Sequence, residues 1–94
     1  MADTRRLLAG LREYHQTLSR HLSVLSTEYL QLERRYQALS PVYEGDAADQ
    51  FKLGWSRTHA TFREYIDRGE VIRLLLAERI EALENANRPD GHLQ

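Results

Sequence analysis

Two columns of mostly apolar residues recur every seven positions between Leu8 and Leu39, and they constrain the possible folds more than any other feature. The first column contains Leu8, His15, Leu22, Tyr29 and Tyr36, and the second contains Leu11, Leu18, Leu25, Leu32 and Leu39. This repeat predicts one long amphipathic helix that packs along another helix. We expect the helix over about residues 4–40, with Asp3 or Thr4 as its N-cap and Pro41 just beyond its end.

A second apolar stripe predicts another helix over about residues 46–87. Asp46 is a good N-cap residue, and Asn85, Asn87 and Pro89 end the pattern, leaving a polar tail at 88–94. The mean spacing of the stripe is close to the helical period, which gives one apolar face. The stripe consists of Ala48, Phe51, Trp55, Thr58, Phe62, Tyr65 or Ile66, Gly69, Ile72, Leu76, Ile80 and Leu83.

Two helices of similar length joined by a turn at residues 41–45 must fold back as an antiparallel hairpin. Charge supports the pairing, because residues 4–40 carry six Arg and three Glu, whereas residues 41–87 carry six basic and nine acidic residues. We therefore predict an all-α fold with a single helical-hairpin domain over residues 1–94. Folding about residue 43 places His15 opposite Val71, His21 opposite Tyr65 and His59 opposite Thr27.

The apolar surface of both helices is wider than one seam requires. In the second helix, Val71, Ile72, Leu74, Leu75 and Leu76 cover more than half of the circumference, and Leu7, Tyr14 and Val24 lie beside the main stripe of the first helix. Such a surface predicts a second partner, and hence an elongated four-helix bundle made of two hairpins. A homodimer and a heterodimer remain equally open. The expected interface residues are Leu18, Leu22, Leu25, Tyr29, Leu32, Trp55, Phe62, Ile72 and Leu76.

The composition of the chain excludes several classes of function. The net charge of −1 argues against nucleic-acid binding, and without an apolar run of membrane-spanning length we expect no membrane span. The chain has no cysteine, so disulfides and thiolate metal sites are excluded. The first residues, MADTRRLLAGLREY, lack a continuous apolar core. We therefore expect a protein made in the cytoplasm which, if exported, leaves without a cleaved signal peptide.

We expect no catalytic, cofactor-binding or metal-binding residues, because no nucleophile elbow, phosphate loop or metal-ligand spacing is present. His15 occupies a heptad position where a polar residue sets register or faces a partner, and its protonation at an interface would loosen the assembly. The acidic residues of the second helix are typical of a solvated face, with pairs such as Glu64–Arg68 and Glu70–Arg73. Gly69, in mid-helix, predicts a close helix–helix approach or a bend.

The turn between the helices carries the most specific motif. In YEGDAADQF, an aromatic residue, a glycine, a small residue and a second aromatic stand at Tyr43, Gly45, Ala47 and Phe51. Turn chemistry alone explains a proline and a glycine between two helices. The whole spacing resembles the W-x-G-x-A-x-x-x-F pattern of the WXG family, the early-secreted-antigen-like proteins of type VII secretion. Tyr43 stands where the family has tryptophan. Trp55, four residues after Phe51, fits an aromatic residue that the family often has at that position.

The resemblance implies a non-enzymatic interaction protein: a substrate, co-substrate or partner of a type VII-like secretion system that works as a homo- or heterodimer. Its partners would be a second copy or another small helical hairpin, a type VII secretion ATPase, or a larger secreted effector. Many exported members carry Tyr-x-x-x-Asp/Glu just beyond the second helix. Here that pattern occurs only at Tyr29 and Glu33, so the resemblance implies a chain whose partner carries the signal, or one that is not exported.

Two other functions are compatible with the residues. The first is a coiled-coil adaptor unrelated to secretion, which needs only the heptads. The second is a small all-helical enzyme similar to chorismate mutase, in which Arg12, Arg34, Arg35 and Arg79 would hold a dicarboxylate. That fold has three helices and polar residues facing into the bundle, whereas this sequence predicts two helices and a column of leucines.

Overall fold

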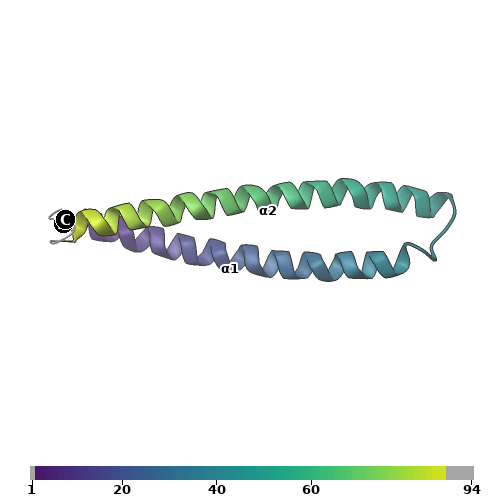
Figure 1. Ribbon diagram of the computed structural model, residues 1–94, viewed down its shortest axis with the longest axis horizontal. Coiled ribbons are helices and arrows are strands. Elements are labelled where there is room, and N and C mark those ends of the chain that lie inside the picture. Colours follow the sequence, from purple (N-terminus) through teal and green to yellow (C-terminus); the bar gives the residue numbers. More distant parts are fainter. Residues whose placement is uncertain (1, 89–94) are drawn as a thin grey trace.

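The protein is an elongated antiparallel hairpin of two helices. The computed structural model describes residues 2–88, in which α1 spans Ala2–Leu39 and α2 spans Asp46–Asn87. The helices lie side by side, with the connecting loop at one end and the start of α1 beside the end of α2 at the other (Figure 1). The molecule measures 68 × 23 × 17 Å. The predicted all-α hairpin is confirmed, while the expected polar tail at 88–94 lies outside the described residues from Pro89 onwards.

Both helices begin differently from the sequence prediction. α1 starts before Asp3 and Thr4, so neither residue is its N-cap, and Asp3 lies in the first turn. The N-cap of α2 is Gly45, which makes no side-chain cap hydrogen bond, so the predicted cap at Asp46 is wrong. Asp46 lies instead in the first turn of α2, where its negative charge stabilises the positive end of the helix dipole.

Backbone hydrogen bonds shape the loop. The amides of Val42 and Tyr43 both donate to the carbonyl of Leu39, at 3.0 and 3.1 Å, and Pro41 lies just past the end of α1 as predicted. Gly45 has φ +105°, a conformation that residues with a β-carbon rarely adopt. Glycine at this position therefore lets the chain leave the turn directly into α2.

The seam between the helices buries the first of the two heptad columns more deeply than the second, in which Leu11, Leu18 and Leu25 are only partly buried. Leu8, Leu22 and Tyr29 are buried on α1, and Ala48 and Gly69 are buried on α2. Leu22 is 2% exposed, and a β-carbon at Gly69 would lie 2.5 Å from its Cδ2 atom. The glycine therefore forms the space that receives the leucine side chain. The predicted close approach of the helices at Gly69 is confirmed.

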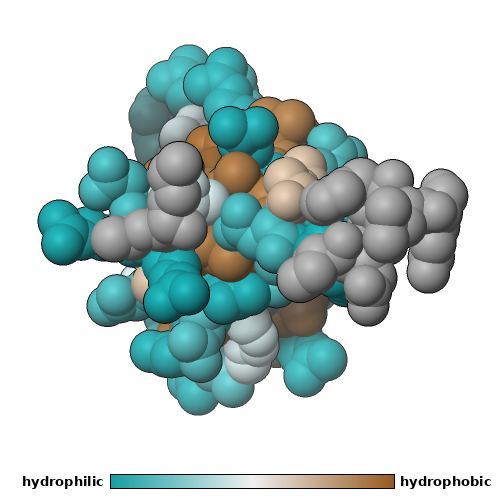
Figure 2. Space-filling model, turned by 90° about the vertical axis from the view of Figure 1, so that its left-hand side faces the viewer, coloured by the Kyte–Doolittle hydropathy of each residue, from teal (hydrophilic) through white to brown (hydrophobic). Residues whose placement is uncertain are grey.

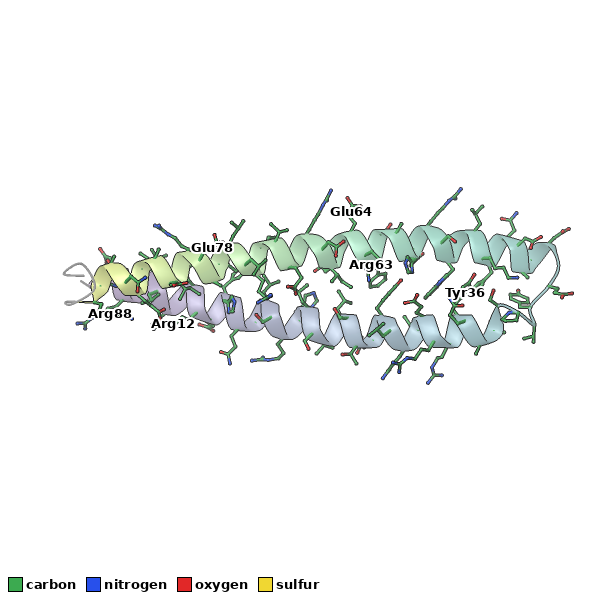
Figure 3. All side chains as sticks on the ribbon, in the orientation of Figure 1. Arg12, Tyr36, Arg63, Glu64, Glu78 and Arg88 are labelled. Atoms are coloured by element: carbon green, nitrogen blue, oxygen red, sulfur yellow. The ribbon has the colours of Figure 1, made fainter. Side chains whose placement is uncertain are left out.

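Aromatic rings fill the loop half of the seam. Tyr36 lies between the helices near the loop (Figure 3) and stacks on Trp55, with ring centroids 4.9 Å apart. Tyr43 folds back onto Phe51 at 6.0 Å, so the turn is packed against the start of α2. Further along, Tyr29 stacks on Trp55 at 6.4 Å. These contacts form a continuous aromatic row from the loop towards the middle of the hairpin.

Three polar contacts fix the register of the helices. His21 and Tyr65 face each other as predicted, with 3.0 Å between His21 Nε2 and the tyrosine hydroxyl. His59 was expected opposite Thr27, but its Nδ1 atom hydrogen-bonds with the hydroxyl of Tyr29, two residues further along α1. At the terminal end, Arg12 forms an ion pair with Glu84. The three contacts therefore hold α1 and α2 together at three levels along the hairpin.

Ionisation of Tyr29 should lower the stability of the hairpin at alkaline pH. Burial, and to a smaller extent the Glu33 carboxylate, raise the pKa of Tyr29 above 10.0, while Arg63 acts in the opposite direction. The folded state therefore favours the neutral hydroxyl. This contribution is fully present below pH 10.0 and is lost as the pH rises through the folded-state pKa.

When the pH is raised from neutral to above 10.0, the free energy of unfolding should therefore fall less in the Tyr29→Phe variant than in the parent chain. At neutral pH the same variant should be less stable by about 1 kcal/mol, because the His59 hydrogen bond is lost. Urea unfolding of both proteins at several pH values measures both effects. An identical alkaline decline in the two proteins would show that Tyr29 does not cause it.

Candidate interaction surface

The two sides of the seam differ in chemistry. On one side, α1 presents the second heptad column, and α2 presents the residues three positions after its buried column. We call these ten residues the leucine-lined face: Leu11, Leu18, Leu25, Leu32, Leu39, Phe51, Thr58, Tyr65, Ile72 and Arg79. On the other side, α1 carries only polar residues in the equivalent positions, namely Arg12, Ser19, Ser26, Glu33 and Ser40.

Two grooves lie beside the leucine-lined face and include some of its residues. One groove, of about 330 Å³, lies between the helices and is lined by His21, Leu25, Thr61, Phe62 and Tyr65. The other, of about 460 Å³, runs along α1 and is lined by Gly10, Glu13, Tyr14, Thr17, Leu18 and His21. His21 belongs to both grooves. Leu18, Leu25 and Tyr65 are the residues of the leucine-lined face that line the two grooves.

Several large apolar side chains of this face are exposed to solvent. Leu32 is 50% exposed, Tyr65 is 52% exposed and Ile72 is 46% exposed. Viewed from the terminal end of the hairpin, hydrophobic residues are visible at the surface between hydrophilic ones (Figure 2). Monomeric soluble proteins rarely expose contiguous apolar patches of more than a few hundred Å². The exposed residues are consistent with a surface that binds a partner.

The predicted interface residues fall into three groups. Leu22 and Tyr29 are buried in the seam, so they hold the hairpin together and offer no surface to a partner. Leu32 and Ile72 are exposed, and the remaining five are partly buried: Leu18, Leu25, Trp55, Phe62 and Leu76. The division arises because one seam between two helices buries one column of each. The polar residues at Ser19, Ser26 and Ser40 are the sequence signal that separates the two sides.

A second apolar patch lies on the outer side of α2. Val71, Leu74 and Leu75 are exposed there, next to the exposed Ile72 of the leucine-lined face. The prediction that residues 71–76 are apolar around more than half of the helix is confirmed. Charged residues interrupt the rest of the outer surface. Glu64 points away from the hairpin (Figure 3) and pairs with Arg68, and Glu70 pairs with Arg73, as predicted.

The turn motif is only partly buried. Tyr43 packs on Phe51, and Gly45 adopts the positive φ described above. Ala47, the small residue of the family pattern, is exposed, whereas its neighbour Ala48 is fully buried. The alanine that packs in the seam is therefore Ala48, one position after the small residue of the family pattern.

Charged and histidine side chains are spread along both helices of the described residues 2–88. Within residues 2–88, no group of three His, Asp or Glu side chains is arranged to hold a metal ion. The arginines that a chorismate-mutase-like enzyme would need are spread along the molecule. Arg12 and Arg34 lie about 33 Å apart along α1, judged from the helical rise, and Arg12 is already paired with Glu84. A single hairpin cannot bring these arginines onto one small dicarboxylate.

His15 is the least expected polar group. Its Nε2 atom is buried, and none of the described residues offers it a hydrogen-bond partner; the same holds for Oγ of Ser19, one turn further along α1. An unpaired buried polar atom is costly, typically by about 1–3 kcal/mol. His15 therefore weakens the terminal half of the seam.

Among the described residues, neither helix is long and apolar enough to cross a membrane. No protein-family model, curated protein or solved structure matches this chain. The resemblance to the WXG family therefore rests on the turn motif and on the hairpin, which is shared by many helical proteins.

Proposed function

We propose that this chain is a non-enzymatic interaction protein whose leucine-lined face packs against a second helical hairpin to form a four-helix bundle. The observation that carries the proposal is the asymmetry of the two sides of the seam. Five leucines recur on one side of α1, and only serine and charged residues occupy the equivalent positions on the other. The seam of one hairpin leaves part of this column uncovered, because Leu32 and Leu39 are 50% and 45% exposed.

The shape of the face favours another hairpin as its partner. The leucine-lined face follows both helices from Phe51 near the loop to Leu11 near the terminal end, along a molecule 68 Å long. A short peptide covers only part of such a length. Two long antiparallel helices match it, because their side chains fit between those of α1 and α2 with ordinary helix-packing geometry.

We further propose that the chain acts as a substrate, co-substrate or partner in a type VII-like secretion system. Support comes from the turn, where Tyr43, Gly45 and Phe51 keep the family spacing, and from the position of this turn between two helices of similar length. The Tyr-x-x-x-Glu pattern at Tyr29 and Glu33 cannot act as an exposed signal while Tyr29 is buried. In this proposal the partner carries the export signal.

Export in the source organism tests this proposal. The chain should reach the culture fluid only when the membrane ATPase of the system is intact. The Leu32→Glu variant should stay in the cell, while Leu30→Glu should be exported, because Leu30 is equally exposed (50%) but lies outside the leucine-lined face. A chain that remains inside cells whether or not the ATPase is present would favour the coiled-coil adaptor instead.

A further inference from the structure

Three exposed apolar side chains on the outer side of α2 belong neither to the seam nor to the leucine-lined face. Val71, Leu74 and Leu75 are each more than half exposed, and we call them the outer α2 patch. Glu64 points away from the hairpin (Figure 3), and Val71 follows it by seven residues, or two helical turns. Val71 therefore lies on the same outward column as Glu64.

Carboxylates stand on both sides of the outer α2 patch along the helix. Two neighbouring outward columns repeat the same order, in which an apolar residue has a carboxylate seven residues before it and another seven residues after it: Glu64, Val71 and Glu78 in one column, and Asp67, Leu74 and Glu81 in the other. Seven residues of a helix span about 10 Å. The patch is therefore a short apolar surface with negative charge about 10 Å beyond each end.

The hairpin itself does not neutralise most of this charge. Asp67, Glu78 and Glu81 are exposed, and they have no ion-pair partner among residues 2–88. Glu64 pairs only with Arg68, one turn away on the same exposed helix surface, and such pairs contribute little to stability. The carboxylates at both ends of the patch are therefore available to positive charges of a partner.

A hairpin bound to the leucine-lined face would leave the patch accessible. Ile72 belongs to that face, and Leu74, two residues later, points to nearly the opposite side of α2, because each residue turns the helix by about 100°. Other exposed leucines on the outer surface stand singly. Leu30 and Leu53, for example, have only polar residues three and four positions away along their helices. The outer α2 patch differs from them because its three apolar side chains are neighbours.

We propose that the outer α2 patch binds a short basic amphipathic helix of another protein, with apolar residues at its centre and Lys or Arg about seven residues to either side. The apolar residues of this helix pack between Val71, Leu74 and Leu75, and its cations meet the carboxylates beyond both ends of the patch. This surface lies outside the leucine-lined face, so it goes beyond the proposed function and does not depend on it. The chain can then hold this helix and a second hairpin at the same time.

The charge beside the patch distinguishes a basic helix from a membrane surface. Helices that lie on membranes carry Lys and Arg next to their apolar residues, because many lipid headgroups are anionic. Carboxylates occupy those positions on α2. An anionic bilayer would therefore be repelled from this side of the hairpin, whereas a basic helix is attracted to it.

A synthetic alanine-based helix tests the inference, with leucines at its centre and lysines seven residues before and after them. Fluorescence anisotropy of the labelled peptide should show saturable binding that weakens as salt is raised, because salt screens the charges. Leu74→Gln should weaken binding on the order of tenfold, since it removes an apolar contact at the centre of the patch. Leu53→Gln is the matched control and should bind like the parent chain, because Leu53 is 51% exposed and lies on the same outward column but outside the patch.

Further measurements establish what is recognised and where. A peptide with glutamates in place of the lysines should bind at least about tenfold more weakly than the lysine peptide. Circular dichroism should show that the Leu74→Gln and Leu53→Gln variants remain as helical as the parent chain, because both side chains are exposed. The Leu32→Glu variant should bind the lysine peptide like the parent chain, because Leu32 lies on the leucine-lined face.

Four results would overturn the inference. Binding that never saturates would exclude a defined site for the basic helix. Equal affinity for the lysine and glutamate peptides would show that charge does not select the partner. Equal affinity of the Leu74→Gln and Leu53→Gln variants, or a loss of binding in Leu32→Glu, would place the peptide elsewhere on the hairpin. Association of the chain with vesicles of anionic phospholipid through Leu74 would assign the patch to a membrane.

Discussion

Replacing Leu22 by alanine should lower the free energy of unfolding by about 3 kcal/mol, because a fully buried leucine side chain leaves a cavity that its surroundings only partly fill. Leu22 is 2% exposed and occupies the space beside Gly69. Rigid helices on both sides limit the collapse of that space. Urea unfolding followed by circular dichroism, at one fixed chain concentration, measures the change.

The same space can be tested from the side of α2. A Gly69→Leu substitution drives a side chain into Leu22, so it should also destabilise the hairpin, even though leucine favours helix formation over glycine. Gly10→Ala is the matched control. Nothing lies within 4 Å of a β-carbon at Gly10, so this change should raise the stability by up to about 1 kcal/mol. A Gly69→Leu variant as stable as the parent would show that the helices do not approach closely there.

Replacing Leu32 by glutamate should weaken association of the hairpins on the order of 100-fold, since a carboxylate would be buried in the interface without a partner. Leu30 provides a matched control only two residues away. Both leucines are 50% exposed in the single hairpin, but Leu30 lies outside the leucine-lined face. Sedimentation equilibrium over a range of concentrations gives the dissociation constants.

Circular dichroism should show that the Leu32→Glu and Leu30→Glu variants are equally helical, because neither side chain is in the seam. An equal dissociation constant for both variants would contradict the assignment of the interface to the leucine-lined face. A second matched pair, Ile72→Glu and Leu74→Glu, repeats the comparison on α2, where the two side chains are 46% and 54% exposed.

Most of the hairpin follows from residue patterns that act locally. The heptad columns and the turn at residues 41–45 predict two antiparallel helices, and the register that sets His21 against Tyr65 follows from folding the chain about its loop. Gly69 indicates a close helix contact, because glycine is otherwise unfavourable in mid-helix. These features depend on the period and the position of residue types, which the sequence displays directly.

Two features are harder to predict: the residue at which each helix starts, and which of the two heptad columns is buried in the seam. Asp46 and Gly45 are both acceptable N-cap residues, and the choice between them depends on the backbone conformation that the turn imposes. The two heptad columns are similarly apolar. Only the polar residues on the far side, such as Ser19 and Ser26, indicate which column remains exposed.

His15 shows a further limit of sequence patterns. A histidine at a heptad position is compatible with a paired or an unpaired ring, and the residues that face it across the seam decide which of them occurs. In the hairpin, Nε2 of His15 and Oγ of Ser19 are buried without a partner among the described residues. No periodicity in the sequence distinguishes this arrangement from a paired histidine such as His21.

Footprinting of exposed side chains by a carbene reagent tests the central claim most directly, because it needs no substitution. In an isolated hairpin, Leu30 and Leu32 would react equally, and so would Leu74 and Ile72, since each pair is about equally exposed. If a second hairpin covers the leucine-lined face, labelling of Leu32 and Ile72 should fall steeply as the chain concentration rises, while Leu30 and Leu74 remain reactive. Equal labelling within both pairs at every concentration would contradict a face that is covered by a second copy of the chain.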